Sequence, residues 1–252
     1  MPRARTGDSC AKSEALFKLQ GGDVGKSTRG RLSSHSLTLP RLYAIVDAEV
    51  LANQGLELSL FVTQLRDAGV SLLQYRDKHG INEQILRNAK IIEDIFREVP
   101  HLLIMNDSPV LAMLSDWNAV HVGQGDAAIA EARGVLQPGG IIGCSTHTDE
   151  QVKAAEEAGA DYIAIGPVFA TSTKADAEPV VGLEGVRRAR MLTRRPLVAI
   201  GGITPENAGS VIEAGADSVA VISALLKPGI EPEKLVRRFL KNMPPVREAV
   251  TG

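Results

Sequence analysis

Features that mark secreted, membrane-spanning or nucleic-acid-binding proteins are scarce in this sequence. Only two cysteines occur in 252 residues, Cys10 and Cys144, so we expect no framework of disulfides and a reducing compartment. No apolar run approaches the ~20 residues of a membrane span, and the hydrophobic segment of a secretory signal is missing. These absences predict a cytoplasmic protein without a membrane partner.

An excess of charge of one sign is also lacking. The 28 basic and 30 acidic side chains give a formal net charge of -2, which gives no reason to expect a nucleic acid or an acidic membrane surface as partner. A hydrophobic content of 44% is typical of a globular protein. Small molecules remain as the expected partners, and nothing in the sequence indicates an oligomeric state.

The first 39 residues differ in composition from the rest. They are rich in Ser, Gly, Lys and Arg and show no sustained apolar period, which predicts a disordered extension. An organellar transit peptide would share the Arg- and Ser-rich composition, but Asp8, Glu14 and Asp23 favour an extension without function. We expect residues 245–252 to form a C-terminal tail.

From Leu42 onward, short strand-like runs alternate with amphipathic helical stretches. The eight expected strands are Leu42–Val46, Val70–Tyr75, Leu102–Met105, Ala119–Val122, Gly140–Cys144, Tyr162–Ile165, Leu197–Ile200 and Ser218–Ile222. The expected helices are Leu56–Ala68, Ile81–Phe96 with Ile85, Ile91, Ile92 and Ile95 facing inward, a short one after Pro109, Asp149–Ala158, Leu183–Leu192, Pro205–Ala214 and Pro232–Asn242. Eight alternations over about 200 residues predict an α/β fold, a single (β/α)₈ (TIM) barrel over residues 40–244, with a doubly wound open sheet as the alternative.

A barrel of this kind carries its function where the strands end at their carboxyl side. Gln74, Arg76 and Lys78 stand two residues apart at the end of the second strand, so an extended backbone projects them to one face. Two cations and an amide suit a phosphate or pyrophosphate. The alternative is a solvated strand end in which Asp77 neutralises a neighbouring cation.

Two carboxylates follow neighbouring strands. Asp107 ends the third strand and Asp126 follows the fourth, so the two should converge and either raise one another's pKa or share a cation. Beside candidate phosphate-binding residues, Mg²⁺ is the expected cation. The alternative is that each aspartate caps the helix that follows it.

The loop after the sixth strand is rich in hydroxyls. Thr171, Ser172 and Thr173 precede Lys174, and glycines Gly166 and Gly182 flank the segment. Hydroxyls and an ammonium group suit an anion, and flanking glycines permit movement. The pattern predicts a mobile lid that closes over an anion.

The last two strands are followed by Gly201-Gly202 and by Ile222-Ser223. Barrel enzymes commonly hold a phosphate on backbone amides at this place. Glycine pairs also serve tight turns without a ligand, and that alternative stays open.

Two histidines need separate interpretations. His147 is the only strand-end histidine and could act as a general acid or base, although a lone histidine is more often structural. Ser145, nearer the strand, is the better candidate for substrate contact. His121 lies within the fourth strand and is expected to pack in the core.

Taken together, these segments resemble the thiamine-phosphate synthase family. The matching segments appear in the family's order and cover about residues 42–241. They are Gln74-Tyr75-Arg76-Asp77-Lys78, Met105-Asn106-Asp107, His121-Val122-Gly123-Gln124-Gly125-Asp126, Gly143-Cys144-Ser145-Thr146-His147, Gly166 to Lys174, Ala199-Ile200-Gly201-Gly202-Ile203 and Val221-Ile222-Ser223.

The resemblance implies coupling of a hydroxymethylpyrimidine pyrophosphate to a thiazole phosphate, giving thiamine phosphate and pyrophosphate, with one Mg²⁺ ion at the site. It implies that pyrophosphate leaves before the thiazole nitrogen attacks, and that Arg76, Lys78, Lys174 and Ser145 are the catalytic residues. By position it assigns the pyrophosphate to Arg76, Lys78 and Lys174, and the Mg²⁺ to Asp107 and Asp126. It assigns the pyrimidine or pyrophosphate to Gln74, Asn106 and Ser145, and the thiazole phosphate or its ring to Thr171, Thr173, Gly202 and Ser223.

The sequence departs from the family pattern at two places. Ser108 stands where the family usually has a basic residue after Asn106-Asp107, and we expect its side chain to face the next helix. Asp176 and Glu178 make the outer half of the loop more acidic than suits a neighbouring pyrophosphate, so we expect that half to lie away from the site.

Two other functions remain open. A thiazole tautomerase is a relative with the same barrel, in which His147 would be the acid or base. That family generally lacks the complete Gln-x-Arg-x-Lys motif and the aspartate pair. A regulatory barrel that binds a phosphorylated ligand without turnover is the other alternative.

Overall fold

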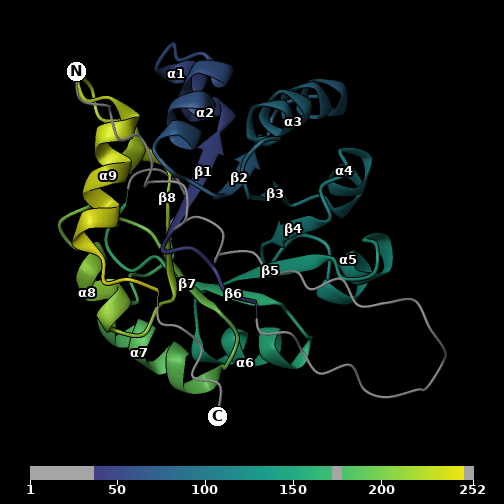
Figure 1. Ribbon diagram of the computed structural model, residues 1–252. Helices are drawn as coiled ribbons and strands as arrows, with labels where there is room; N and C mark the ends of the chain where they lie inside the picture. Colours follow the sequence, from purple (N-terminus) through teal and green to yellow (C-terminus); the bar gives the residue numbers. More distant parts are fainter. Residues whose placement is uncertain (1–36, 172–177, 247–252) are drawn as a thin grey trace, which may run out of the picture. The chain divides into compact units, whose positions relative to one another are not determined.

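The computed structural model describes residues 37–171 and 178–246 (Figure 1). Expectations for residues 1–36, for Ser172, Thr173 and Lys174, and for the tail beyond residue 246 lie outside the described residues. Within the described ranges, no helix has the length and apolar character to cross a membrane.

A closed barrel of eight parallel strands forms the centre of the fold. Closure is complete because β1 pairs with β8, Leu42 opposite Val219, as well as with β2. The TIM barrel is therefore confirmed, and the open sheet is wrong. The strands are β1 Leu42–Asp47, β2 Leu72–Arg76, β3 Leu102–Asn106, β4 Ala119–Val122, β5 Ile141–Thr146, β6 Tyr162–Ile165, β7 Leu197–Ile200 and β8 Ser218–Val221.

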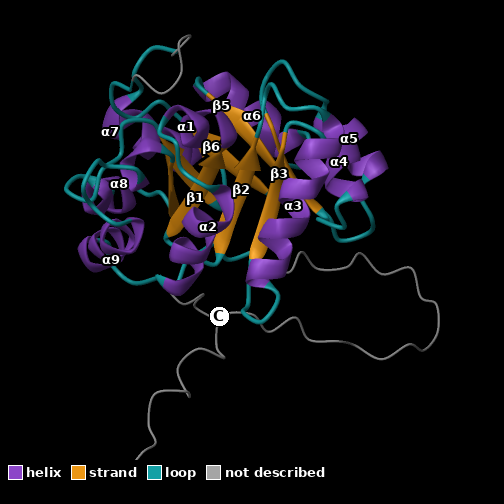
Figure 2. Ribbon diagram, turned by 90° about the horizontal axis from the view of Figure 1, so that it is seen from above, coloured by secondary structure: helices purple, strands orange, loops and turns teal. Residues whose placement is uncertain are grey.

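The helices form an outer layer around these strands, as Figures 1 and 2 show. Most expected helices occur within a few residues of their predicted bounds. They are α2 Leu58–Asp67, α3 Asn82–Phe96, α4 Pro109–Leu114, α6 Asp149–Glu157, α7 Gly182–Leu192, α8 Ala208–Glu213 and α9 Pro232–Asn242. Three short ones were not predicted: α1 Ala48–Asn53, α5 Ile129–Val135 and the 3₁₀ helix η1 Ser223–Leu225. Elements of one or two turns are too short to show a helical period.

The side chains of each strand alternate between two cores. In β1, Tyr43 and Ile45 belong to the cluster inside the barrel, whereas Leu42, Ala44 and Val46 belong to the cluster between strands and helices. This period of two is the ordinary pleat of a strand. It decides which residues can reach the barrel interior.

One predicted buried face is partly wrong. In α3, Ile85 and Ile92 are buried, but Ile91 is 39% exposed. Ala89 and Phe96 complete the inward stripe instead. These four positions follow the helical period of 3.6 residues, and Ile91 lies outside it.

A glycine in β5 makes room for an aromatic ring in the barrel interior. A Cβ at Gly143 would lie 1.9 Å from Cζ of Tyr162, and the Tyr162 side chain is fully buried. No rotation of the ring about its own axis relieves that clash, because Cζ lies on the axis. A side chain at position 143 must therefore displace Tyr162.

We predict that Gly143→Ala lowers the free energy of unfolding by about 3 kcal/mol, the upper range for an overpacked core. Urea unfolding followed by circular dichroism measures this. The matched control is Gly134→Ala in α5, where a Cβ would meet nothing within 4 Å; it should stabilise by about 0.5–1 kcal/mol through helix propensity. Equal effects of the two substitutions would contradict the packing role of Gly143.

Candidate active site

Two adjoining pockets occupy the mouth of the barrel at the carboxyl ends of the strands. The small pocket, of about 110 Å³, is lined by Gln74, Arg76, Lys78, Asn106, Asp107 and Asp126 among others. The large pocket, of about 440 Å³, is lined by Thr171, by residues 200–204 after β7 and by residues 220–224 after β8. Both pockets share Ser145, His147, Ala164, Ile200, Ala220 and Ile222. The expected site residues that the structure describes therefore meet at one mouth.

Arg76 forms an ion pair with a carboxylate of the neighbouring strand. Its guanidinium donates to Oδ2 of Asp47, whose side chain is only 3% exposed. Oδ1 of Asp47 accepts a second hydrogen bond from Val50 N at 3.1 Å and so caps α1. The carboxylate that neutralises Arg76 is thus Asp47. The alternative, in which Asp77 neutralises this cation, is wrong.

Asp77 has a local role. Its carboxylate accepts hydrogen bonds from the backbone amides of His79 and Gly80 at 3.2 and 2.7 Å, and from the hydroxyl of Tyr75 at 3.2 Å. These bonds stabilise the turn after β2. Burial raises the pKa of Tyr75 to about 12, so this hydroxyl remains a donor.

Lys78 reaches Asp107, which has an unusual backbone conformation. The Lys78 ammonium lies 2.9 Å from Oδ2 of Asp107. Asp107 has a φ of 62°, in the left-handed region that costs a non-glycine residue free energy and often marks a functional site. Its amide donates to the carbonyl of His121 on β4 at 2.7 Å. Ser108 caps α4 by accepting from Leu111 N at 3.2 Å, so the predicted orientation of Ser108 is confirmed and capping by Asp107 is wrong.

Asp126 approaches the Asp107 carboxyl group. Burial raises the pKa of Asp126 above its ordinary value, and a hydrogen bond with Asp107 raises it further. Oδ2 of Asp126 also accepts from Gly123 N at 2.7 Å. Asp126 does not cap a helix, because the N-cap position of α5 is Ala128. Two carboxyl groups that oppose each other's ionisation in this way fit a shared cation.

A metal bound at this pair would take few ligands from the protein. Among the described residues no group of three or more His, Cys, Asp or Glu side chains could hold a metal ion. Mg²⁺ commonly binds through one or two carboxylates and completes its shell with water and substrate oxygens. The donor set of Asp107 and Asp126 fits that chemistry.

His121 is buried, as predicted, but it is not an inert core residue. Its side chain is 8% exposed and lines the small pocket. Nε2 lies 2.8 Å from Oγ of Ser145, and Nδ1 lies 2.9 Å from the hydroxyl of Tyr162. Tyr162 and Tyr43, whose hydroxyls lie 2.9 Å apart, were not predicted from the sequence, because an inward-facing tyrosine in a strand looks like any other core aromatic.

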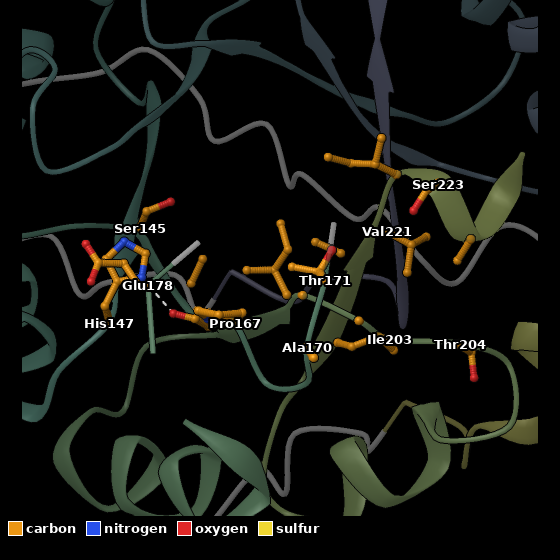
Figure 3. Close-up of a pocket in the computed structure, with 18 of the residues that line it drawn as sticks. Ser145, His147, Pro167, Ala170, Thr171, Glu178, Ile203, Thr204, Val221 and Ser223 are labelled. Carbon is orange, nitrogen blue, oxygen red and sulfur yellow. Dashed lines mark hydrogen bonds between the residues drawn. The ribbon is translucent and has the colours of Figure 1, made fainter. Parts of the chain in front are cut away.

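His147 lies between the two pockets. Its Nδ1 is 2.6 Å from the carbonyl oxygen of Gly166; a carbonyl accepts only, so Nδ1 carries a proton. In the neutral ring, Nε2 is then the unprotonated nitrogen. Figure 3 shows His147 with Ser145 and Glu178 at one side of the large pocket and Ser223 at the other.

The base of the loop after β6 is fixed by packing and hydrogen bonds. Val168 is fully buried, and its amide donates to the carbonyl of Ile200 at 2.9 Å. A Cβ at Gly166 would lie 2.2 Å from the same carbonyl oxygen. Gly166 thus permits a close approach of β6 and β7, and movement of the loop stays a prediction.

The outer half of this loop is described only in part. Thr171 lines the large pocket, whereas Thr173 and Lys174 lie outside the described residues. Glu178 also lines the large pocket. The expectation that the acidic outer half lies away from the site is therefore wrong for Glu178.

The glycine pair after β7 is required by the loop that packs on it. Gly201 and Gly202 have φ values of 99° and 62°. A Cβ at Gly202 would lie 2.5 Å from the carbonyl oxygen of Ala170. Both glycines, with Ile222 and Ser223, line the large pocket. A tight turn alone does not account for the pair, because the neighbouring loop also leaves no room for a side chain.

Lys227 is a lining residue that the sequence did not reveal. It follows η1, is partly buried and lines the large pocket. No carboxylate in the described part of the chain forms an ion pair with it. No motif surrounds Lys227, and only the turn after β8 brings it to the pocket.

Comparisons with known proteins agree with one another. Residues 42–225 match the family described as thiamine monophosphate synthase. A thiamine-phosphate synthase of Koribacter versatilis is 47% identical over 209 residues, which are 81% of this chain and 96% of the relative. One from Chloroflexus aurantiacus is 38% identical over 186 residues, 74% of this chain and 85% of the relative. A solved thiamine phosphate pyrophosphorylase from Pyrococcus furiosus superposes with a TM-score of 0.71 and 31% identity, covering 80% of this chain and 94% of that one.

We predict that Arg76→Ala lowers the free energy of unfolding by about 3 kcal/mol, because it leaves the buried carboxylate of Asp47 without its counter-ion. Chemical denaturation measures this in the absence of substrate. Arg87→Ala is the control: it removes an ion pair with Glu83 whose side chains are 52% and 76% exposed, and should cost about 0.5 kcal/mol. An Arg76→Ala loss no larger than the control's would show that Asp47 is solvated without its partner.

Proposed function

The chain belongs to the thiamine monophosphate synthase family, and from this premise we propose that its barrel mouth couples 4-amino-2-methyl-5-hydroxymethylpyrimidine pyrophosphate with thiazole phosphate. The products are thiamine phosphate and pyrophosphate, so the enzyme is a transferase of the pyrimidine-methyl group. The observation that carries the assignment is the pair of adjoining pockets, one ionic and one largely uncharged, that share Ser145 and His147. We also expect the reaction to take place in the cytoplasm, as the scarcity of cysteine predicts.

The small pocket suits the pyrimidine pyrophosphate. Arg76 and Lys78 supply positive charge for the leaving group, with Lys174 as a third cation from the loop. Gln74, Asn106 and Ser145 then contact the pyrimidine or the pyrophosphate.

The charge balance around the small pocket calls for a further cation. Two cations, Arg76 and Lys78, face three carboxyl groups, Asp47, Asp107 and Asp126. A pyrophosphate would therefore enter a region without excess positive charge, which disfavours its binding. One Mg²⁺ ion at Asp107 and Asp126 would reverse this balance and neutralise charge on the departing pyrophosphate.

The proposed reaction needs no covalent bond between the substrate and the protein. In a dissociative displacement the pyrophosphate leaves first, and the thiazole nitrogen then captures the pyrimidine-methyl cation. The barrier depends on charge that develops on the leaving group, and positioned donors stabilise it. Arg76, Lys78 and Ser145 line the small pocket, which supports this role for them, and the mechanism needs no pair of nucleophile and base.

The large pocket suits the thiazole phosphate. Gly201, Gly202, Ile222 and Ser223 line it where barrels commonly bind phosphate, with Thr171 from the loop above. Thr173 would act with Thr171. The shared wall of Ser145 and His147 lets the thiazole ring reach the pyrimidine in the small pocket.

We expect purified protein to form thiamine phosphate from the two phosphorylated substrates with Mg²⁺, and to form none with a chelator. Asp107→Asn should lower turnover by roughly 10²–10³-fold, the scale of losing one charge-stabilising group. Mn²⁺ binding followed by electron paramagnetic resonance should weaken in Asp107→Asn and Asp126→Asn, independently of turnover.

Three results would argue against this assignment. Product formation unchanged by the chelator would exclude the metal role. Isomerisation of a thiazole carboxylate that His147→Ala abolishes, without any coupling, would favour the tautomerase. Binding of both substrates without turnover would favour the regulatory barrel.

We predict that Lys227→Gln raises KM for thiazole phosphate about tenfold, because it removes a charge-assisted contact worth ~1.5–3 kcal/mol from a partly exposed position. KM for the pyrimidine pyrophosphate should not change. Lys234→Gln is the control, since Lys234 is 70% exposed and pairs with Glu231 on α9. Steady-state kinetics with each substrate varied in turn measures both effects, and an equal rise in the two KM values would contradict a phosphate-specific role.

A further inference from the structure

Five side chains from five strands form an unbroken hydrogen-bonded chain across the barrel interior. Nε2 of Gln74 donates to the Tyr43 hydroxyl at 2.8 Å, and that hydroxyl lies 2.9 Å from the hydroxyl of Tyr162. The Tyr162 hydroxyl lies 2.9 Å from Nδ1 of His121, whose Nε2 lies 2.8 Å from Oγ of Ser145. The order by strand is β2, β1, β6, β4 and β5.

The two ends of the chain are residues that the proposed function places against the pyrimidine substrate, Gln74 and Ser145. The three members between them are buried: Tyr43 is 1%, Tyr162 0% and His121 8% exposed. The ring of His121 stacks on that of Tyr162, with centroids 5.5 Å apart and an interplanar angle of 25°. Packing therefore holds the intermediate members in place, and Tyr43 and His121 line the small pocket together with the two ends.

All the hydrogen bonds in this series are donated in the same direction, from Gln74 toward Ser145. Tyr43 accepts from the Gln74 amide, which leaves its single proton for Tyr162, its other hydrogen-bond partner among the described residues. Tyr162 then donates to Nδ1 of His121, and the neutral imidazole carries its proton on Nε2 and donates to Ser145. Burial keeps both tyrosines protonated, since it raises the pKa of each well above its ordinary value.

The imidazole is neutral in this arrangement. A doubly protonated His121 would aim an N–H at Tyr162, which already accepts from Tyr43. The Tyr162 proton would then have no acceptor in a fully buried place, and an unsatisfied buried donor costs about 1–3 kcal/mol.

The consequence falls on Ser145. Its oxygen accepts from His121, so its own proton is directed toward the pocket rather than into the barrel. We propose that Tyr43, Tyr162 and His121 are positioning residues that fix the Ser145 hydroxyl as a hydrogen-bond donor to an oxygen of the leaving pyrophosphate. This proposal rests on the proposed function. Pyrophosphate oxygens only accept, so a chain running the other way would present them with a lone pair and repel them.

The first test is a double-mutant cycle. Tyr43→Phe and Tyr162→Phe each remove one hydroxyl and keep the ring. Each should lower kcat at least tenfold and leave KM for the thiazole phosphate unchanged. The loss should be smaller than the roughly 10²–10³-fold loss that removal of a whole oxyanion donor causes. In the Ser145→Ala background the same substitutions should change kcat less than about twofold, because there is no hydroxyl left to position. Ser145→Thr, which keeps a hydroxyl, should retain the sensitivity to Tyr162→Phe.

The matched control is Tyr75→Phe. Tyr75 is fully buried but packs between strands and helices. Its hydroxyl accepts from Asn88 at 2.6 Å and donates to Asp77 at 3.2 Å, and neither partner belongs to the hydrogen-bonded series from Gln74 to Ser145. This variant should leave kcat unchanged. Losses from Tyr162→Phe that carry over in full to the Ser145→Ala background would overturn the proposal, because they would show a structural effect independent of Ser145.

The second test reads the direction of the chain in the free protein. The ¹⁵N chemical shifts of the His121 imidazole distinguish its two neutral tautomers, and we expect the proton on Nε2. A proton on Nδ1, or on both nitrogens, would overturn the proposal. This measurement needs no turnover, so it tests the positioning role separately from the proposed function. The wrong tautomer would overturn the positioning role even if the protein forms thiamine phosphate, and absence of product would overturn the proposed function even if the tautomer is the expected one.

Discussion

The pleat of the barrel strands is the constraint on which the other features of the site depend. Each strand sends alternate residues inward, so Tyr43 and Ile45 enter the barrel while Ala44 and Val46 face the helices. Closure between β1 and β8 then brings inward residues from distant parts of the sequence to a common interior. Without closure, Tyr43 and Tyr162 would stand on opposite halves of an open sheet, and no hydrogen-bonded chain could connect Gln74 to Ser145.

Ion pairing between neighbouring strands sets the electrostatics of the mouth. Arg76 pairs with Asp47 on β1, and Lys78 pairs with Asp107 at the end of β3. These pairs orient the cations before substrate enters, and preorganised charge stabilises a developing oxyanion at little cost in reorganisation. The carboxylates of Asp47 and Asp107 also offset the positive charge of Arg76 and Lys78, so the two ion pairs leave little excess charge at the small pocket.

The sequence predicts much of the fold and the composition of the site, but few of the hydrogen bonds and contacts within it. Strands such as Ala119–Val122 and Tyr162–Ile165 are found with their predicted bounds, because each is a short run of mostly apolar residues that a glycine follows at once. The sequence also predicts that Asp107 and Asp126 converge, since parallel neighbouring strands end at the same edge. It does not predict α1, which the Asp47 side chain caps, or the close approach of Gly166 to the carbonyl of Ile200. Partners across a closed barrel, such as His121 and Tyr162, have no signature in local spacing.

The polar interior of this barrel has a consequence for directed evolution and thermostabilisation. Replacing both partners of a buried hydrogen bond by apolar side chains of the same shape can be nearly neutral or stabilising. Tyr43, Tyr162 and His121 lie in the layer where such substitutions would be attractive to a selection for heat resistance. A library screened for melting temperature alone would therefore enrich variants that have lost these polar side chains. A library screened for turnover would retain them at some cost in stability.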